Sequence, residues 1–172
     1  MRKYQIGISC AITVVFLSFQ GIAAAKNTDQ STPRTLRTIA RIYMTWGNYD
    51  NARVMAEKAY SIAQKTSAES DEMALCMIDL ATVYSNLGLL SESDRMFQSG
   101  IELQKQALFA DHPYVAQTYR MLSDVQRRAG DLEKAEQSLS EAVSIMLNHC
   151  DIQSKEMSPF ILESAKYFEA KG

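Results

Sequence analysis

The sequence contains few of the residues that interrupt helices. Among its 172 residues are 7 glycines and 3 prolines, and after residue 25 no stretch shows the alternation of apolar and polar residues that a half-buried strand requires. Hydrophobic residues make up 47% and charged residues 22%, which excludes the composition of a disordered chain. We therefore expect one domain with a core of its own, helical throughout.

Residues that could carry out chemistry are also scarce. The chain has 2 histidines and 3 cysteines, and their spacing is not that of a four-ligand zinc site. His149 and Cys150 are neighbours at an expected helix end, where adjacent side chains point in different directions. No phosphate-binding glycine loop, Gly-x-Ser-x-Gly or His-Glu-x-x-His sequence is present. The sequence predicts no enzyme, no metal and no cofactor; an enzyme whose site shows no motif is the least favoured alternative.

Neither sign of charge dominates the chain. Lys and Arg number 18 against 20 Asp and Glu, a formal charge of −2. A protein that binds nucleic acid or an anionic membrane surface would carry a clear basic excess. We therefore expect neither of these partners.

The longest apolar run lies at the N-terminus. Arg2 and Lys3 precede apolar residues 6–19, and residues 21–25 end in a small-x-small pattern. This order is typical of a secretory signal peptide. It predicts cleavage after Ala25, a linker over residues 26–32, and a periplasmic or secreted mature chain that does not contact the membrane. An uncleaved anchor is the alternative, although the run is short for a spanning helix. Cys10 does not fit lipid attachment, because the residues before it depart from the lipoprotein pattern.

Two cysteines, Cys76 and Cys150, remain after such cleavage. They could pair in an oxidising compartment, or each could be a small buried hydrophobe. The sequence leaves this choice open, although the repeat described next places the two in different helix pairs.

An internal repeat is the main signal in the sequence. Gly47, Gly88, Gly130 and Gly172 recur at an almost constant interval, and a period of about 42 residues lies in the range that indicates stacked repeats. Small residues recur seven positions before these glycines: Ala40, Ala81, Ser123 and Ala165. They recur again five positions after the first three: Ala52, Ser93 and Ala135. Small residues let two antiparallel helices approach closely, and each glycine can end the first helix in a left-handed turn.

The repeat and the helix-start signals together predict seven helices. Asp131 is expected to cap the helix that follows Gly130, and Ser91 with Asp94 resembles a capping box. Ser158 and, less well, His112 stand as capping residues directly before prolines. The expected helices are 33–47, 50–66, 71–88, 91–108, 113–129, 132–148 and 157–171.

These residues resemble the tetratricopeptide repeat, a helix pair with large, small, aromatic and glycine residues at set positions. The first repeat shows Ile39, Ala40, Tyr43, Gly47, Tyr49, Ala52 and Ala59. The second shows Leu80, Ala81, Tyr84, Gly88, Leu90, Ser93, Phe97 and Gly100. The third shows Leu122, Ser123, Gly130, Leu132, Ala135, Leu139 and Ala142. The long period, and a helix opening at Asp111-His112-Pro113, resemble the kinesin-light-chain type of repeat. Gln126 and Ser164 depart from the pattern, because they stand where an aromatic and a large residue are usual.

The resemblance implies an all-α fold, a right-handed α-α superhelix of about three and a half helix pairs. Its repeats would span residues 33–70, 71–111 and 112–153, and a half-repeat or capping helix would span 157–172. It also implies an adaptor that holds a protein or peptide partner in the concave groove lined by the first helix of each pair.

The groove positions carry over from the family by register. They are Arg34, Arg37, Arg41, Met44, Thr45, Leu75, Ile78, Thr82, Ser85, Asn86, Gln117, Arg120, Asp124, Arg127, Arg128, Leu162 and Lys166. Arginine is frequent at both ends of this set, and guanidinium groups bind carboxylates through two parallel hydrogen bonds. The sequence therefore favours a partner with acidic residues or a free C-terminus. Alternatively, these arginines are solvated or paired with the protein's own acids. The family's chaperone-binding carboxylate clamp is not reproduced.

A homodimer or larger self-assembly is the second functional hypothesis. A short solenoid can leave apolar surfaces at its ends, and such surfaces can stack on one another. We expect Phe160, Ile161 and Phe168 to be exposed on the last helix and to favour this association.

Overall fold

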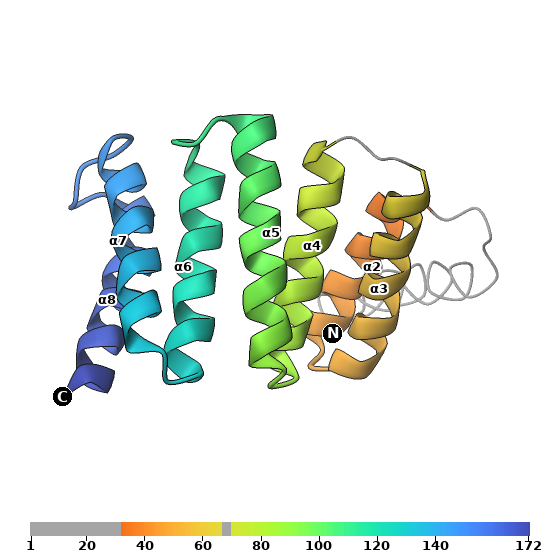
Figure 1. Cartoon of the computed structure of the whole chain (residues 1–172), viewed down its shortest axis with the longest axis horizontal. Coiled ribbons are helices and arrows are strands. Elements are labelled where there is room, and N and C mark those ends of the chain that lie inside the picture. Colours follow the sequence, from red (N-terminus) through yellow and green to blue (C-terminus); the bar gives the residue numbers. More distant parts are fainter. Residues whose placement is uncertain (1–31, 67–69) are drawn as a thin grey trace, which may run out of the picture.

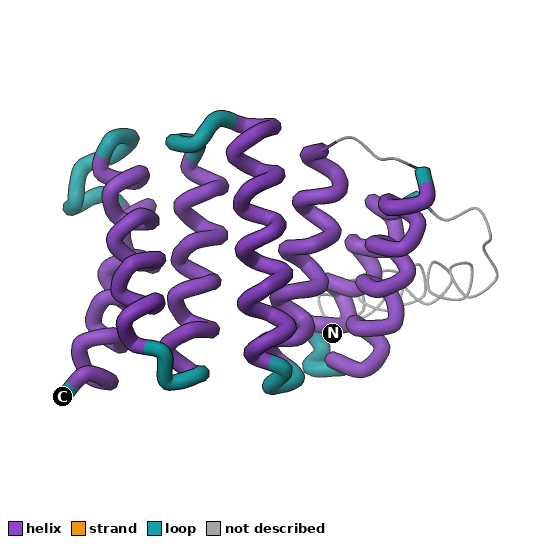
Figure 2. The backbone as a smooth tube through the Cα atoms, viewed as in Figure 1, coloured by secondary structure: helices purple, strands orange, loops and turns teal. Residues whose placement is uncertain are grey.

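The computed structural model describes residues 32–66 and 70–172, whose helices stack side by side in chain order (Figure 1). They are α2 (Pro33–Thr45), α3 (Tyr49–Lys65), α4 (Ser70–Asn86), α5 (Leu90–Leu108), α6 (Pro113–Arg128), α7 (Leu132–Leu147) and α8 (Ser158–Lys171). A short 3-10 turn, η1 (Lys155–Met157), precedes α8. All seven expected helices are confirmed to within two residues, and no strand occurs in the described residues (Figure 2). The predicted signal peptide and residues 26–31 lie outside them.

Polar side chains fix the start of several helices. The expected caps are confirmed at Asp131, whose carboxylate accepts from the backbone N–H of Lys134 at 3.2 Å, and at His112, whose Nδ1 accepts from the N–H of Tyr114 at 3.1 Å. Each satisfies a donor that the first helical turn leaves unpaired.

Two other expected caps are wrong. α5 begins at Leu90, one residue before Ser91, because the Gly88 turn leads directly into it, and Leu89 in the cap position makes no side-chain hydrogen bond. Ser158 is already helical, since η1 runs straight into α8. Backbone geometry, rather than a hydroxyl group, starts these two helices.

Glycine ends each first helix, as expected. Gly47, Gly88 and Gly130 have φ values of 69°, 78° and 82°, in the left-handed region that other residues enter only at a cost of about 1 kcal/mol or more. The residue after each glycine donates its N–H to a carbonyl five residues earlier, at 2.9 Å in all three turns. This is the Schellman arrangement, which pairs carbonyls that the helix end would otherwise leave free.

The two helices of each pair meet at their small residues. Ala40 and Ala52 are fully buried where α2 meets α3. In the next pair the Ser93 hydroxyl donates to the carbonyl of Ala81 at 2.8 Å. In the third the Ser123 hydroxyl donates to the carbonyl of Ala135 at 3.0 Å. A larger side chain at any of these positions would separate the helices.

Large apolar residues fill the space between successive pairs. The largest core cluster joins α4 to α8 and includes Phe97, Ile101, Val115 and Phe160. Phe160 corrects the prediction that it is exposed: it is fully buried, because it lies on the inward face of α8. Ile161 and Phe168 on the same helix are exposed, as expected.

Neither cysteine in the described residues forms a disulfide. Cys76 is buried in α4, and Cys150 is half-buried just after α7. Cys76 packs in the cluster formed by α2, α3 and α4, so it serves as a small apolar core residue. Burial raises the pKa of its thiol to about 12.

Candidate functional site

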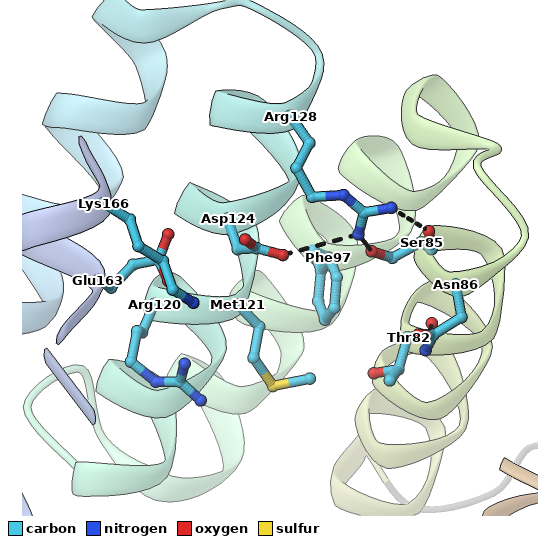
Figure 3. Close-up of a pocket in the computed structure, with 10 residues that line it drawn as sticks. All are labelled: Thr82, Ser85, Asn86, Phe97, Arg120, Met121, Asp124, Arg128, Glu163 and Lys166. Atoms are coloured by element: carbon cyan, nitrogen blue, oxygen red, sulfur yellow. Dashed lines mark hydrogen bonds and ion pairs between the residues drawn. The ribbon is translucent and has the colours of Figure 1, made fainter. Parts of the chain in front are cut away.

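Two hollows lie along the first helices, α2, α4, α6 and α8. The first, here called the N-terminal pocket, has a volume of about 410 Å³. It is lined by Arg34, Arg37, Thr38, Arg41, Asp71, Glu72 and Leu75. The second, here called the central groove, has a volume of about 210 Å³ (Figure 3). It is lined by Thr82, Ser85, Asn86, Phe97, Arg120, Met121, Asp124, Arg128, Glu163 and Lys166.

Arg37 in the N-terminal pocket is bound by the protein itself. Its Nε donates to Asp79 at 2.7 Å and its Nη1 to Glu72 at 3.2 Å, and only 9% of the residue is exposed. Asp79 stands one repeat after Arg37, so the two face each other from adjacent first helices. This cluster links α2 to α4, and its two carboxylates neutralise the charge of Arg37 within the fold.

Burial and charge act against each other in that cluster. Burial lowers the pKa of Arg37, but the ion pairs with Asp79 and Glu72 outweigh this effect and raise its pKa overall. For Asp79, burial is the largest influence and raises the pKa; Arg37 lowers it, and the pKa stays above its ordinary value overall.

A similar cluster ties α6 to α8. Arg127 donates from Nε to Glu163 at 3.1 Å and is also paired with Asp124. Glu163 is 1% exposed and receives a second cation, Lys166, at 3.4 Å. Burial lowers the pKa of Arg127, but Glu163 and Asp124 raise it overall. Arg127 thus helps to hold α8 against α6.

Arg128 bridges the central groove from α6 to α4. Its Nη1 donates to the Ser85 hydroxyl at 2.6 Å and its Nη2 to the Ser85 carbonyl at 2.8 Å, as Figure 3 shows. Asp124 lies 3.6 Å from the same guanidinium. Both terminal nitrogens of this arginine are therefore engaged within the protein.

Arg120, on the same helix, differs from these three arginines. Its Nε is buried and has no hydrogen-bond partner anywhere in residues 32–66 and 70–172. No acidic side chain of the described chain forms an ion pair with it, and Figure 3 draws no interaction to it. A buried donor without a partner costs roughly 1–3 kcal/mol. Arg120 is thus the arginine of the central groove whose side chain the fold leaves unpaired.

The structure divides the predicted groove residues into three groups. Arg34, Arg37 and Arg41 line the N-terminal pocket. Thr82, Asn86, Arg120 and Asp124 line the central groove, together with Ser85, Arg128 and Lys166. Ile78 and Arg127 line neither hollow: Ile78 packs against the main core, and Arg127 is bound to Glu163.

Two acidic residues of these clusters, Asp79 and Glu163, were absent from the predicted set. Both are mostly buried and bind an arginine of a neighbouring first helix. They stand two repeat periods apart and so occupy the same register position. A search for acids one repeat away from each arginine would have found the pair of Arg37.

Within the described helices and turns, no group of three or more His, Cys, Asp or Glu side chains is arranged to hold a metal ion. The same residues include no helix that is both long enough and apolar enough to cross a membrane.

A stack of antiparallel helix pairs, with a groove along the first helices, defines a helical-repeat solenoid of the kind that typically binds proteins. A sequence model of the tetratricopeptide repeat matches residues 31–106 and 72–148, well over half of the chain. The chain belongs to the tetratricopeptide repeat family.

Sequence relatives point to the repeat type that the long period indicated. Kinesin light chain-related protein 1 of Arabidopsis thaliana is 27% identical over 140 residues, which cover 80% of this chain and 23% of that protein. Mouse (Mus musculus) nephrocystin-3 is 31% identical over 99 residues, 54% of this chain and 8% of that protein. The chain therefore spans less than a quarter of the length of either relative.

Solved structures show the same fold. A Podospora anserina protein described as a kinesin light chain with nearly identical TPR-like repeats matches with a TM-score of 0.76 at 21% identity, over 99% of this chain and 82% of its own. The type III secretion translocator chaperone SycD of Yersinia enterocolitica matches with a TM-score of 0.61 at 14% identity, over 88% and 94%. At such identities the likeness concerns the fold alone.

Proposed function

We propose that the chain is an exported interaction module whose central groove binds an acidic segment or free C-terminus of a protein partner. The tetratricopeptide fold is typical of protein–protein interaction modules. The fold does not determine the chemistry of the partner. The charges of the groove indicate it.

The unpartnered guanidinium of Arg120 is the observation that carries this proposal. Arg37, Arg127 and Arg128 are neutralised or hydrogen-bonded within the protein, whereas the Nε of Arg120 is buried without a partner. A carboxylate placed in the groove would meet this guanidinium without competition from an acid of the protein, and the guanidinium's terminal nitrogens could donate charge-assisted hydrogen bonds. Neutral peptide groups would gain less, because charge-assisted hydrogen bonds are about twice as strong.

The surroundings of Arg120 favour an anion on one side of the groove. Lys166 from α8 lines the same hollow and is 43% exposed at its side chain. The two acids of the groove, Asp124 and Glu163, are already neutralised by Arg127, Arg128 and Lys166. A carboxylate that enters beside Arg120 therefore meets cations that exceed the local acids.

Peptides of defined charge test this proposal. Matched peptides would carry acidic residues or their amides, and free or amidated C-termini, and binding to the full chain would be measured at low and raised salt. We expect the acidic or free-carboxylate members to bind, and their affinity to fall as salt rises. Arg120→Glu should weaken that binding by at least about tenfold, since it places like charges together.

Arg95→Glu is the matched control, because Arg95 is an exposed arginine on the second helix α5, outside the central groove. It should leave binding unchanged. Equal binding of acidic and amidated peptides, or equal affinity in Arg120→Glu and the parent, would exclude the carboxylate-binding groove.

Export is the part of the proposal that the N-terminal sequence supports. The basic start, the apolar run and the small residues before Lys26 form the order of a signal peptide. Mass spectrometry of the protein from its producing cell should find an N-terminus at Lys26 in the periplasmic or secreted fraction. An intact Met1 in the cytosolic fraction would contradict export.

A further inference from the structure

The outer face of α8 is built to receive another helix. Ala165 stands at the same register position as Ala40, Ala81 and Ser123. Those three residues are fully buried, each against the second helix of its own pair. Ala165 is exposed, and no other element of the described chain covers it.

The residues around Ala165 agree with this interpretation. Ile161 is 49%, Leu162 58% and Phe168 66% exposed. At 100° per residue all three lie within about 60° of the direction of Ala165, so they form one continuous stripe on the helix. We call Ile161, Leu162, Ala165 and Phe168 the open face of α8, the helix at the end of the stack opposite α2 and α3 (Figure 1).

A helix face that stays in contact with water would look different. Terminal repeats remain soluble by turning a polar face outward. The inward face of α8 is covered, since Phe160, Glu163 and Tyr167 are all buried. Its outward face is mostly apolar, with Glu169 at the side of the stripe. A contiguous apolar stripe on a soluble protein marks an interaction surface.

We propose that the open face of α8 binds the same face of a second copy of this chain, in a two-fold symmetric dimer. The surface is distinct from the central groove, so this dimer and the groove's partner can be tested separately. The three helix pairs within the chain supply the packing rule: antiparallel helices that touch at a small residue.

The spacing on α8 satisfies the requirement of a two-fold axis, namely that one patch be complementary to itself. With two α8 helices antiparallel and Ala165 at the crossing, Phe168 of one copy lies over Ile161 of the second copy, and the reverse. The two contacts flank the alanines, whose small size lets the backbones approach. The same arrangement places Leu162 beside the stem of Glu169 of the second copy, and the opposed helix dipoles favour it.

The size of the patch sets the expected affinity. α8 has 14 residues, about 21 Å of helix, and one such helix buries less than the ~800 Å² per partner of a stable interface. We therefore expect a dimer with a dissociation constant in the micromolar range, seen as a mass that rises with concentration.

Sedimentation or light scattering over a concentration series of the full chain measures this mass. Phe168→Glu should weaken dimer formation by at least about tenfold, because it puts a carboxylate against the Ile161 contact of the second copy. Phe109→Glu is the matched control: Phe109 is 80% exposed but lies in the turn after α5, and its substitution should leave the mass unchanged. Circular dichroism should show that both variants remain folded.

A cross-link tests the antiparallel geometry without removing the interface. Ala165→Cys places two thiols beside the two-fold axis, and oxidation should give a disulfide-linked dimer in high yield. Ala107→Cys substitutes another exposed alanine, near the end of α5, and should not increase cross-linking above that of the parent.

Three outcomes would overturn the proposal. They are a constant monomeric mass at all concentrations, a dimer that Phe168→Glu does not weaken, and equal cross-linking of Ala165→Cys and Ala107→Cys. Arg120→Glu should leave the dimer intact, so a loss of groove binding in that variant cannot be mistaken for a loss of assembly.

Discussion

The N-terminal pocket and the central groove both contain arginines that the repeat register places on the concave side. Arg37 and Arg120 differ in whether acids of the protein itself bind them. Arg37 is bound by Asp79 and Glu72 and is 9% exposed. Arg120 has a buried Nε with no partner in the described residues. The difference teaches that an arginine in a groove position indicates a binding site only when the fold has left its charge unpaired.

The largest effect should come from breaking the N-terminal cluster. Arg37→Ala leaves the carboxylate of Asp79 buried without its cation, and we expect the free energy of unfolding to fall by about 2–4 kcal/mol. Urea denaturation measures it. Arg34→Ala removes an exposed arginine from the same helix and should change stability by less than about 0.5 kcal/mol. Equal effects of the two substitutions would mean that the ion pairs of Arg37 do not stabilise the fold.

Breaking the cluster of Arg127 and Glu163 should also lower the free energy of unfolding, but by less. Glu163→Gln keeps the shape of the side chain but removes its charge, and Arg127 keeps Asp124 as a partner. We expect a loss of about 1–3 kcal/mol. Glu141→Gln, at an exposed position of α7, is the control. A stability unchanged by Glu163→Gln would show that apolar packing alone holds α8.

The thiol of Cys76 reports whether water enters the region beside Arg37. Burial raises its pKa to about 12, so between about pH 9 and pH 12 the unfolded chain ionises this thiol while the folded chain does not. Stability should therefore fall as pH rises through that range, and it should be unaffected by this group below pH 9.

Cys76→Ala should remove that part of the alkaline loss, which thermal unfolding at pH 8, 9 and 10 would detect. Iodoacetamide at pH 8 should modify Cys150 but spare Cys76 until the chain is unfolded, as peptide mapping can show. Rapid modification of Cys76 in the folded chain would contradict its burial.

The smallest effect on stability should come from Arg120. Arg120→Met removes the unpaired N–H but retains an unbranched side chain of comparable reach, so we expect a change of less than about 0.5 kcal/mol, or a slight gain. Urea denaturation of Arg120→Met and Arg37→Ala, measured together, compares the two losses in the free energy of unfolding. A loss as large as that expected for Arg37→Ala would mean that Arg120 stabilises the fold and is not left free for a partner.

The sequence predicted the helices well because their ends depend on local conformation. The three turn glycines adopt positive φ values, as expected, and Asp131 caps its helix. The expected caps at Ser91 and Ser158 were wrong, because the preceding backbone already starts each helix before the hydroxyl group can cap it. The Gly88 turn leads into α5, and η1 leads into α8. The exposed position expected for Phe160 was wrong because the sequence does not show which side of the last helix packs on its neighbours: Phe160 is buried and Ile161, about 100° further around the helix, is exposed.

The sequence by itself determined the repeat, its period, the helix pairs and the small residues where they touch, because each follows from spacing along the chain. Only the tertiary structure decided which charges are neutralised. Arg37 and Arg127 are bound by acids 42 and 36 residues away, whereas Arg120, on the same helix as Arg127, is not. It also decided that Ala165, unlike its three equivalents, has no helix against it in the described chain. Pairing and coverage depend on which side chains neighbouring helices bring within a few ångströms. The repeat period can suggest a candidate pair such as Arg37 and Asp79, but only the packed helices show which pairs form.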